Sequence, residues 1–116
     1  VVAIQLAKAA IASGIQLLLA AGDMTKNDLA QVVVAGAFGA RINLESAMSI
    51  GMVPELPIQK FISVGNAAGT GARLALVSKT ERALAERIAQ GTQYLELTAV
   101  PAFSATFARA LKLSPV

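Results

Sequence analysis

Hydrophobic residues recur at helical spacing along the first twenty positions of the chain. One stripe consists of Ile4, Ile11, Ile15 and Leu18. This pattern predicts an amphipathic helix over residues 2–21 that buries the stripe, with Gly22 as its C′ stop. Polar residues at positions 5, 8, 13 and 16 leave a polar face on the same helix. We therefore interpret the segment as a core helix, and as neither a membrane span nor a signal peptide.

Two short apolar runs depart from the helical period, and each ends in glycine. Residues 31–35 lead into Gly36 and Gly39, and residues 60–64 lead into Gly65. Both runs predict strands, and the first is expected to be buried on both faces. Ligands of open α/β sheets lie at the carboxyl ends of strands, where glycine lets the backbone come close to them. The two units predict parallel neighbouring strands that handle a nucleotide, and a tight connection that binds nothing is the plainer alternative.

Capping signals mark most of the remaining elements. Thr25 and Asp28 resemble a capping box that predicts one helical turn before the first strand. Asn43 is the expected cap of a helix over 44–50, and Gly51 is its expected stop. The other predicted helices cover residues 67–77, 78–91 and the segment after Pro101. Alternating polar and apolar residues predict a third strand over 92–98.

The composition is typical of a fragment of a larger protein. The chain has 116 residues, of which 55% are hydrophobic and 15% charged, whereas soluble domains carry about 25% charged residues. We expect a single domain over 1–116, a fragment of a longer protein that packs against another domain or subunit. The net charge is +3, but the basic residues are scattered singly, without the basic patches that favour nucleic-acid binding.

The residue inventory limits the chemistry. The sequence has neither cysteine nor histidine, which removes thiolate and imidazole chemistry and most zinc, haem and iron–sulfur ligation. Its seven acidic residues lack the spacing of an acid–base pair or a magnesium site, so we predict no catalytic residue and no metal ligand. The candidates for binding are Gly36, Phe38, Gly39, Gly65 and Asn66. Phe38 would pack over a base or ribose, or else in a core, and Asn66 would cap a helix that faces an anion, or cap it and nothing more.

Three motifs together resemble a known family. They are Val33-Val34-Ala35-Gly36-Ala37-Phe38-Gly39, Asn43-Leu44-Glu45-Ser46-Ala47 through Ile50-Gly51, and Ser63-Val64-Gly65-Asn66-Ala67-Ala68-Gly69-Thr70-Gly71-Ala72-Arg73. The chain resembles, over essentially its whole length, the C-terminal domain of the reductive activators of corrinoid proteins. These belong to the superfamily of acetate kinase, sugar kinases, heat-shock proteins and actin. The resemblance implies the C-terminal lobe of a ribonuclease-H-like, actin-like ATPase, an α/β fold with a small mixed sheet packed with helices.

The resemblance also implies a function. In this family ATP, with magnesium, binds between two lobes, and its hydrolysis drives an electron from an iron–sulfur cluster to inactive cob(II)alamin. The cob(I)alamin that results re-enters methyl transfer. The cluster would lie in a region absent from this chain. By topology, Gly36, Ala37, Phe38 and Gly39 become nucleotide-proximal.

Partners and location follow from the same resemblance. The partners would be a corrinoid protein and the other lobe of the same chain, with a homodimer left open, in the cytoplasm, without nucleic acid or membrane. Two alternatives stay open: a lobe of another superfamily ATPase, such as an activator of 2-hydroxyacyl-CoA dehydratases, and a non-catalytic docking or dimerisation module.

Overall fold

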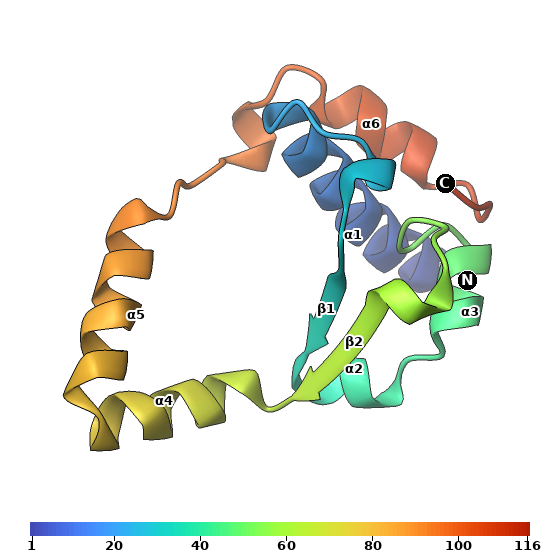
Figure 1. Cartoon of the computed structure of the whole chain (residues 1–116). Coiled ribbons are helices and arrows are strands. Elements are labelled where there is room, and N and C mark those ends of the chain that lie inside the picture. Colours follow the sequence, from blue (N-terminus) through green and yellow to red (C-terminus); the bar gives the residue numbers. More distant parts are fainter. The chain divides into compact units, whose positions relative to one another are not determined.

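A computed structural model describes residues 1–116, apart from the side chain of Phe38. It is an α/β structure of α-helices, short 3-10 turns and two strands (Figure 1). The α-helices are α1 (Val2–Ala21), α2 (Gly36–Arg41), α3 (Leu44–Ser49), α4 (Ala67–Val77), α5 (Lys79–Gly91) and α6 (Phe103–Ala110). The strands are β1 (Val32–Ala35) and β2 (Phe61–Gly65). The 3-10 turns are η1 (Lys26–Asp28), η2 (Ile58–Lys60) and η3 (Leu97–Ala99).

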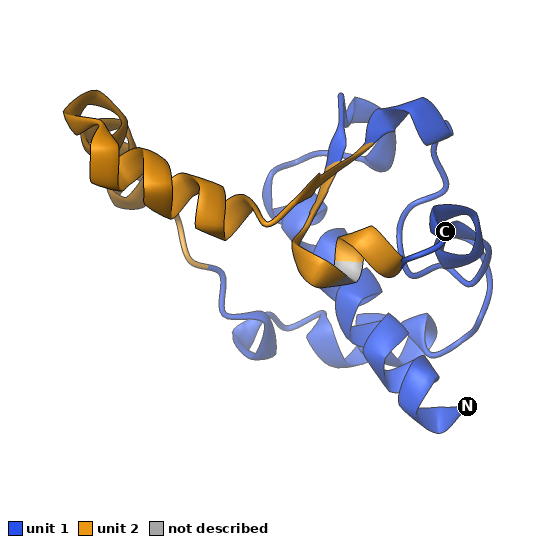
Figure 2. Ribbon diagram, turned by 90° about the horizontal axis from the view of Figure 1, so that it is seen from below, with its two compact units in different colours: residues 1–32, 42–61, 95–116 blue, residues 33–41, 62–94 orange. Residues whose placement is uncertain are grey.

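The chain divides into two compact units, coloured separately in Figure 2. Unit 1 comprises residues 1–32, 42–61 and 95–116, and unit 2 comprises residues 33–41 and 62–94. Unit 1 therefore contains α1, α3 and α6, and unit 2 contains α2, α4, α5 and most of the sheet.

The core of unit 1 lies where α1 packs against α6. Ala9 and Ala12 of α1 and Ala110 of α6 are buried together, and Phe107 and Leu111 pack against them. Small side chains at such a contact let two helix backbones approach closely, so that many dispersion contacts form per residue. The helix predicted after Pro101 is confirmed as α6.

The buried face of α1 differs from the predicted stripe. Ile4 and Leu18 are 56% and 58% exposed, whereas Lys8 and Ser13, assigned to the polar face, are 1% and 0% exposed. The side chain of Lys8 accounts for part of this reversal. Its Nζ donates hydrogen bonds to the carbonyl oxygens of Ala110 (2.7 Å) and Lys112 (2.6 Å) at the end of α6. Helix C-termini leave carbonyls unpaired and attract cations, so the polar face of α1 supplies what α6 lacks.

By length and apolar composition, α1 is the one helix among the described residues that could also cross a membrane. It packs onto α6 through Ala9 and Ala12, but only 28% of its apolar stretch is buried, so its role as a core helix stays a prediction.

The ends of α1 and α3 follow the same backbone rule. After α3, Gly51 has φ +76°, and the N–H of Met52 donates to the Ala47 oxygen at 2.9 Å, as a Schellman motif requires. After α1, the residue with positive φ is Asp23 (+52°), and the N–H of Met24 donates to the Leu19 oxygen at 2.8 Å. The predicted stop at Gly51 is confirmed, whereas the C′ position after α1 is one residue later than predicted.

In unit 2, β1 and β2 are hydrogen-bonded neighbours, and their arrows run the same way in Figure 1. The predicted parallel pair is confirmed, with α3 and a proline-containing segment between the strands along the chain. The expected burial of β1 on both faces is wrong, because Val33 is 56% exposed and burial alternates along the strand. In a two-stranded sheet each strand is an edge strand.

The helices predicted after β2 are confirmed, whereas the third strand is not. Helices α4 and α5 form within a residue of their predicted bounds, and Ser78 Oγ accepts from the N–H of Glu81 at 3.2 Å. The third strand predicted over 92–98 does not form, and η3 occupies its end. Alternation gives a segment two faces, but a strand also needs a partner for its backbone hydrogen bonds. In the part of the chain that the structure describes, β1 and β2 pair with each other.

Candidate functional site

Two glycines end the two parallel strands at the same edge of the sheet. Gly36 follows β1 with φ +82°, and Gly65 ends β2 with φ +61°. These conformations are strained for residues with a side chain. A Cβ atom added to either glycine would have no heavy atom within 4 Å. The backbone conformation thus requires glycine at both positions, and open space lies beside both.

The segment after β1 is a helix rather than the predicted glycine turn. Helix α2 begins at Gly36 itself, so Ala37 lies in its first turn, exposed and with an ordinary negative φ. Gly39 lies inside α2, where an added Cβ would come within 2.7 Å of Val34 Cγ1 and 3.1 Å of the Val34 oxygen. Gly39 therefore lets α2 pack closely on β1. The predicted contact of Phe38 with a base or ribose lies outside the described residues.

The segment after β2 is held by a cap that two residues form together. Asn66 Oδ1 accepts from the N–H of Gly69 at 3.0 Å, which confirms Asn66 as the cap of α4. An added Cβ at Gly69 would lie 2.9 Å from Asn66 Cγ and closer still to its amide nitrogen. Gly69 is therefore needed to accommodate the cap. The remaining first-turn N–H groups of α4 form the positive end of an eleven-residue helix.

The charges of unit 2 suit an anion. It carries five basic residues (Arg41, Arg73, Lys79, Arg82 and Arg87) and two acidic residues (Glu81 and Glu86). Arg82 is engaged within the unit, since its Nε donates to the Ala75 oxygen at the end of α4 at 2.9 Å. No group of three or more potential metal ligands exists among the described residues. The residues present fit a nucleotide, which needs space and backbone donors, and do not fit a magnesium site.

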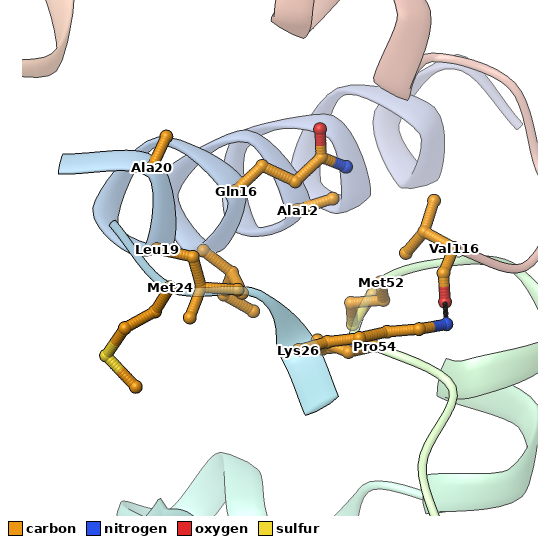
Figure 3. A pocket seen from close by; sticks show the side chains of 10 residues that line it. Ala12, Gln16, Leu19, Ala20, Met24, Lys26, Met52, Pro54 and Val116 are labelled. Atoms are coloured by element: carbon orange, nitrogen blue, oxygen red, sulfur yellow. Dashed lines mark hydrogen bonds between the residues drawn. The ribbon is translucent and has the colours of Figure 1, made fainter. Parts of the chain in front are cut away.

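A second feature is a cavity in unit 1, which the sequence did not reveal (Figure 3). Its volume is about 270 Å³. It is lined by Ala12, Ile15, Gln16, Leu19, Ala20, Met24, Lys26, Met52, Pro54 and Val116. Seven of the ten lie within residues 12–26, five of them at helical spacing along α1, and the other three are Met52, Pro54 and Val116. Periodicity along α1 does not show that these segments meet, so the sequence alone could not indicate the cavity. The one local feature of the cavity visible in the sequence was the Thr25–Asp28 capping box, which fixes the backbone of Lys26.

Comparison with known proteins relates this geometry to one family. A family model described as the C-terminal, ASKHA domain of RACo matches residues 1–115. A corrinoid activation enzyme, RamQ of Eubacterium limosum, is 42% identical over 105 residues, which are 90% of this chain and 18% of the relative. A solved structure of a reductive activator for a corrinoid, iron–sulfur protein superposes with a TM-score of 0.86 at 37% identity, covering 95% of this chain and 18% of that one. The chain thus spans about a fifth of the length of these relatives. The α/β fold expected from the resemblance is confirmed, although its sheet is a parallel pair and not mixed.

Proposed function

Because the chain belongs to the family of C-terminal ASKHA domains of RACo, we propose that it is the nucleotide-binding lobe of an ATP-dependent reductive activator. The parent protein would return the cob(II)alamin of a corrinoid protein to cob(I)alamin with electrons from an iron–sulfur cluster elsewhere in its chain. Two relatives named for corrinoid activation support this proposal over an activator of 2-hydroxyacyl-CoA dehydratases.

One observation carries the nucleotide assignment. Gly36 and Gly65 end neighbouring parallel strands in left-handed conformations, each with open space beside it. Parallel strand ends followed by helices are where α/β proteins bind nucleotides. We assign Gly36, Ala37 and Gly39 to one side of the nucleotide, and Gly65 and Asn66 to the other. Phe38 remains a predicted contact on the first side.

The described residues indicate which part of ATP binding and hydrolysis this chain would perform and which part the other lobe would perform. This chain would bind and orient the nucleotide with backbone N–H groups and the N-terminus of α4, beside the open space at the two glycines. ATP hydrolysis would supply the energy for the uphill electron transfer, and the acidic groups for magnesium would come from the other lobe. We therefore expect residues 1–116 alone to hydrolyse no ATP. Phosphate release above background that a substitution within the purified chain abolishes would contradict this.

The intact protein provides the sharper test. Gly36→Val forces a β-branched residue to φ +82°, at a cost of about 1–3 kcal/mol, so we expect ATP or ADP to bind about ten- to a hundredfold more weakly. Gly91→Val is the matched control: it is in the same unit, also has nothing within 4 Å of an added Cβ, but has no positive φ. Gly36→Ala is a milder second variant in case valine prevents folding. Binding is measured by calorimetry and folding by thermal melts.

The outcomes separate the readings. Weaker nucleotide binding by folded Gly36 variants, with Gly91→Val unchanged, supports the site. Unchanged affinity in folded Gly36 variants would overturn it and favour a docking or dimerisation module. A homodimer and a cytoplasmic location stay predictions of the proposal, tested by sedimentation of the intact protein and by fractionation of cells.

A further inference from the structure

The cavity in unit 1 has the properties of a small-molecule site. Its 270 Å³ correspond to the volume of about nine water molecules in the liquid. Its walls are mostly aliphatic, with side chains from the C-terminal half of α1 on one side and Met52 and Pro54 on the other (Figure 3). Met24 and Met52 add flexible walls that adapt to the shape of an occupant. The cavity is half open, and it shares with ligand sites a mostly apolar lining and a few polar groups that can orient an occupant.

One charged side chain lines this apolar space. The chain of Lys26 runs along the cavity, and its Nζ donates to the Val116 oxygen at 2.9 Å (Figure 3). An ammonium group has three N–H donors, so this bond leaves two for a second acceptor. The backbone that carries Lys26 is fixed, because the capping box of Thr25 and Asp28 closes η1 around it. The second polar group in the lining is the carboxamide of Gln16, from α1.

We propose that this cavity binds a medium-chain aliphatic carboxylate, with the alkyl chain among the α1 and methionine side chains and the carboxylate on Lys26 Nζ. An apolar volume with a single cation on its lining is complementary to an anion with one aliphatic tail. The proposal is independent of the nucleotide site, since residues of unit 1 alone form the cavity. A failure of either assignment leaves the other standing.

A series of ligands tests the apolar part. The intact protein is titrated calorimetrically with butanoate, hexanoate, octanoate and decanoate at constant pH and salt. Each added methylene buried in the cavity should tighten binding about fourfold. Because a methylene occupies about the volume of a water molecule, the gain should stop near about eight to nine carbons. Affinity that does not depend on chain length would overturn the proposal.

Two variants with matched controls test the residues. Lys26→Gln should weaken octanoate binding about tenfold or more, and should leave 1-octanol, the neutral ligand, unaffected within about twofold. Lys112→Gln, on an exposed lysine that does not line the cavity, should change neither. Ala20→Phe places a ring at the cavity wall and should abolish binding, whereas Ala10→Phe, at an exposed position of α1 outside the lining, should not.

The remaining outcomes are decisive as well. If octanol and octanoate bind equally well, Lys26 does not interact with the carboxylate, and the proposal is wrong. No saturable binding of any member of the series would also overturn it. In a last outcome, the cavity binds no ligand while Ala20→Phe, and not Ala10→Phe, destabilises the intact protein. That result would show that a side chain from another part of the protein fills the cavity, and the proposal would be wrong.

Discussion

Unit 1 and unit 2 are held together by different means. Unit 1 contains nearly all the buried residues of the described chain, including the Ala9, Ala12 and Ala110 cluster. In unit 2, Gly39 is the one buried residue among those described, and α4 and α5 contain no buried residue. Unit 1 is stabilised by packing. Unit 2 is stabilised by helix caps and by the backbone hydrogen bonds between β1 and β2, with little burial of side chains.

The charges divide the same way. Unit 1 carries five basic and five acidic residues, whereas unit 2 carries five basic and two acidic residues, and hence the whole net charge of +3. Unit 2 also holds the left-handed glycines at the strand ends. Elements that bind ligands are commonly drawn from the less stable part of a fold. The two units thus differ in how they are stabilised and in charge, unit 1 being packed and neutral and unit 2 less buried and positively charged.

Glycines with positive φ in the two units should respond differently to alanine. At Gly51 in unit 1, an added Cβ would collide with the Ser114 oxygen and lie 3.2 Å from Lys8 Nζ. Gly51→Ala should therefore cost about 3 kcal/mol, from the left-handed strain and the overpacking together. Gly65→Ala in unit 2, with nothing within 4 Å, should cost about 1 kcal/mol, from the strain alone. Urea unfolding of both variants measures the difference, and equal costs would remove packing as the distinction between the units.

Lys8 should be the most important polar side chain of unit 1. Lys8→Met removes the donor to the Ala110 and Lys112 oxygens and should lower the free energy of unfolding by about 2 kcal/mol. Burial lowers the pKa of Lys8 from its ordinary 10.5. Just below pH 10.5 the unfolded state then binds more protons, so the stability of the wild type should rise with pH relative to the variant.

Denaturant unfolding between pH 7 and 10.5 tests both parts of this expectation. Lys112→Met, on an exposed lysine, is the control and should stay within about 0.5 kcal/mol of the wild type. A Lys8→Met variant as stable as this control would show that packing alone holds α1 to α6.

Sequence reasoning succeeded where the determinants are local. The caps at Asn43, Asn66 and Ser78 form as predicted, since each needs only a side chain and an N–H three residues on. The bounds of the two strands were predictable for a similar reason, because each apolar run ends in glycine.

Sequence reasoning failed where residues far apart in the chain determine the structure. The apolar stripe of α1 satisfied helical periodicity, yet Ile4 and Leu18 stay exposed, whereas Lys8 is buried and donates to the carbonyls at the end of α6. Residues 92–98 alternate correctly and form no strand, because the sheet in the described chain consists of β1 and β2 and does not extend to them. The glycine edge of the candidate site was predictable, but the positions of α2 and Gly39 were not, since Val34 sets them by contact. The cavity at Lys26 needs four segments brought together by folding.

In unit 2 the cap of α4 should matter for that helix alone. Asn66→Ala removes the acceptor for the Gly69 N–H and should cost about 1 kcal/mol. Hydrogen exchange should show faster exchange in the first turn of α4, with the amides of α1 unchanged. Gly69→Ala should have a similar effect, because an added Cβ displaces the Asn66 side chain. Combining both substitutions should cost no more than either alone, and additive costs would contradict the shared cap.

The smallest expected effect is a dependence on pH at the capping box in unit 1. Asp28 Oδ2 accepts from the backbone N–H of Thr25 at 2.8 Å and from its hydroxyl at 3.0 Å. These bonds, the backbone one foremost, lower the pKa of Asp28 below its ordinary 3.8. The stabilisation is therefore complete above pH 3.8 and is lost as the pH falls through the lowered value. The difference in unfolding free energy between wild type and Asp28→Asn, measured from pH 6 downward, should shrink over that range, and it should shrink less in a Thr25→Ala background. A difference that stays constant with pH would show that the turn is held by its backbone hydrogen bonds and not by the carboxylate.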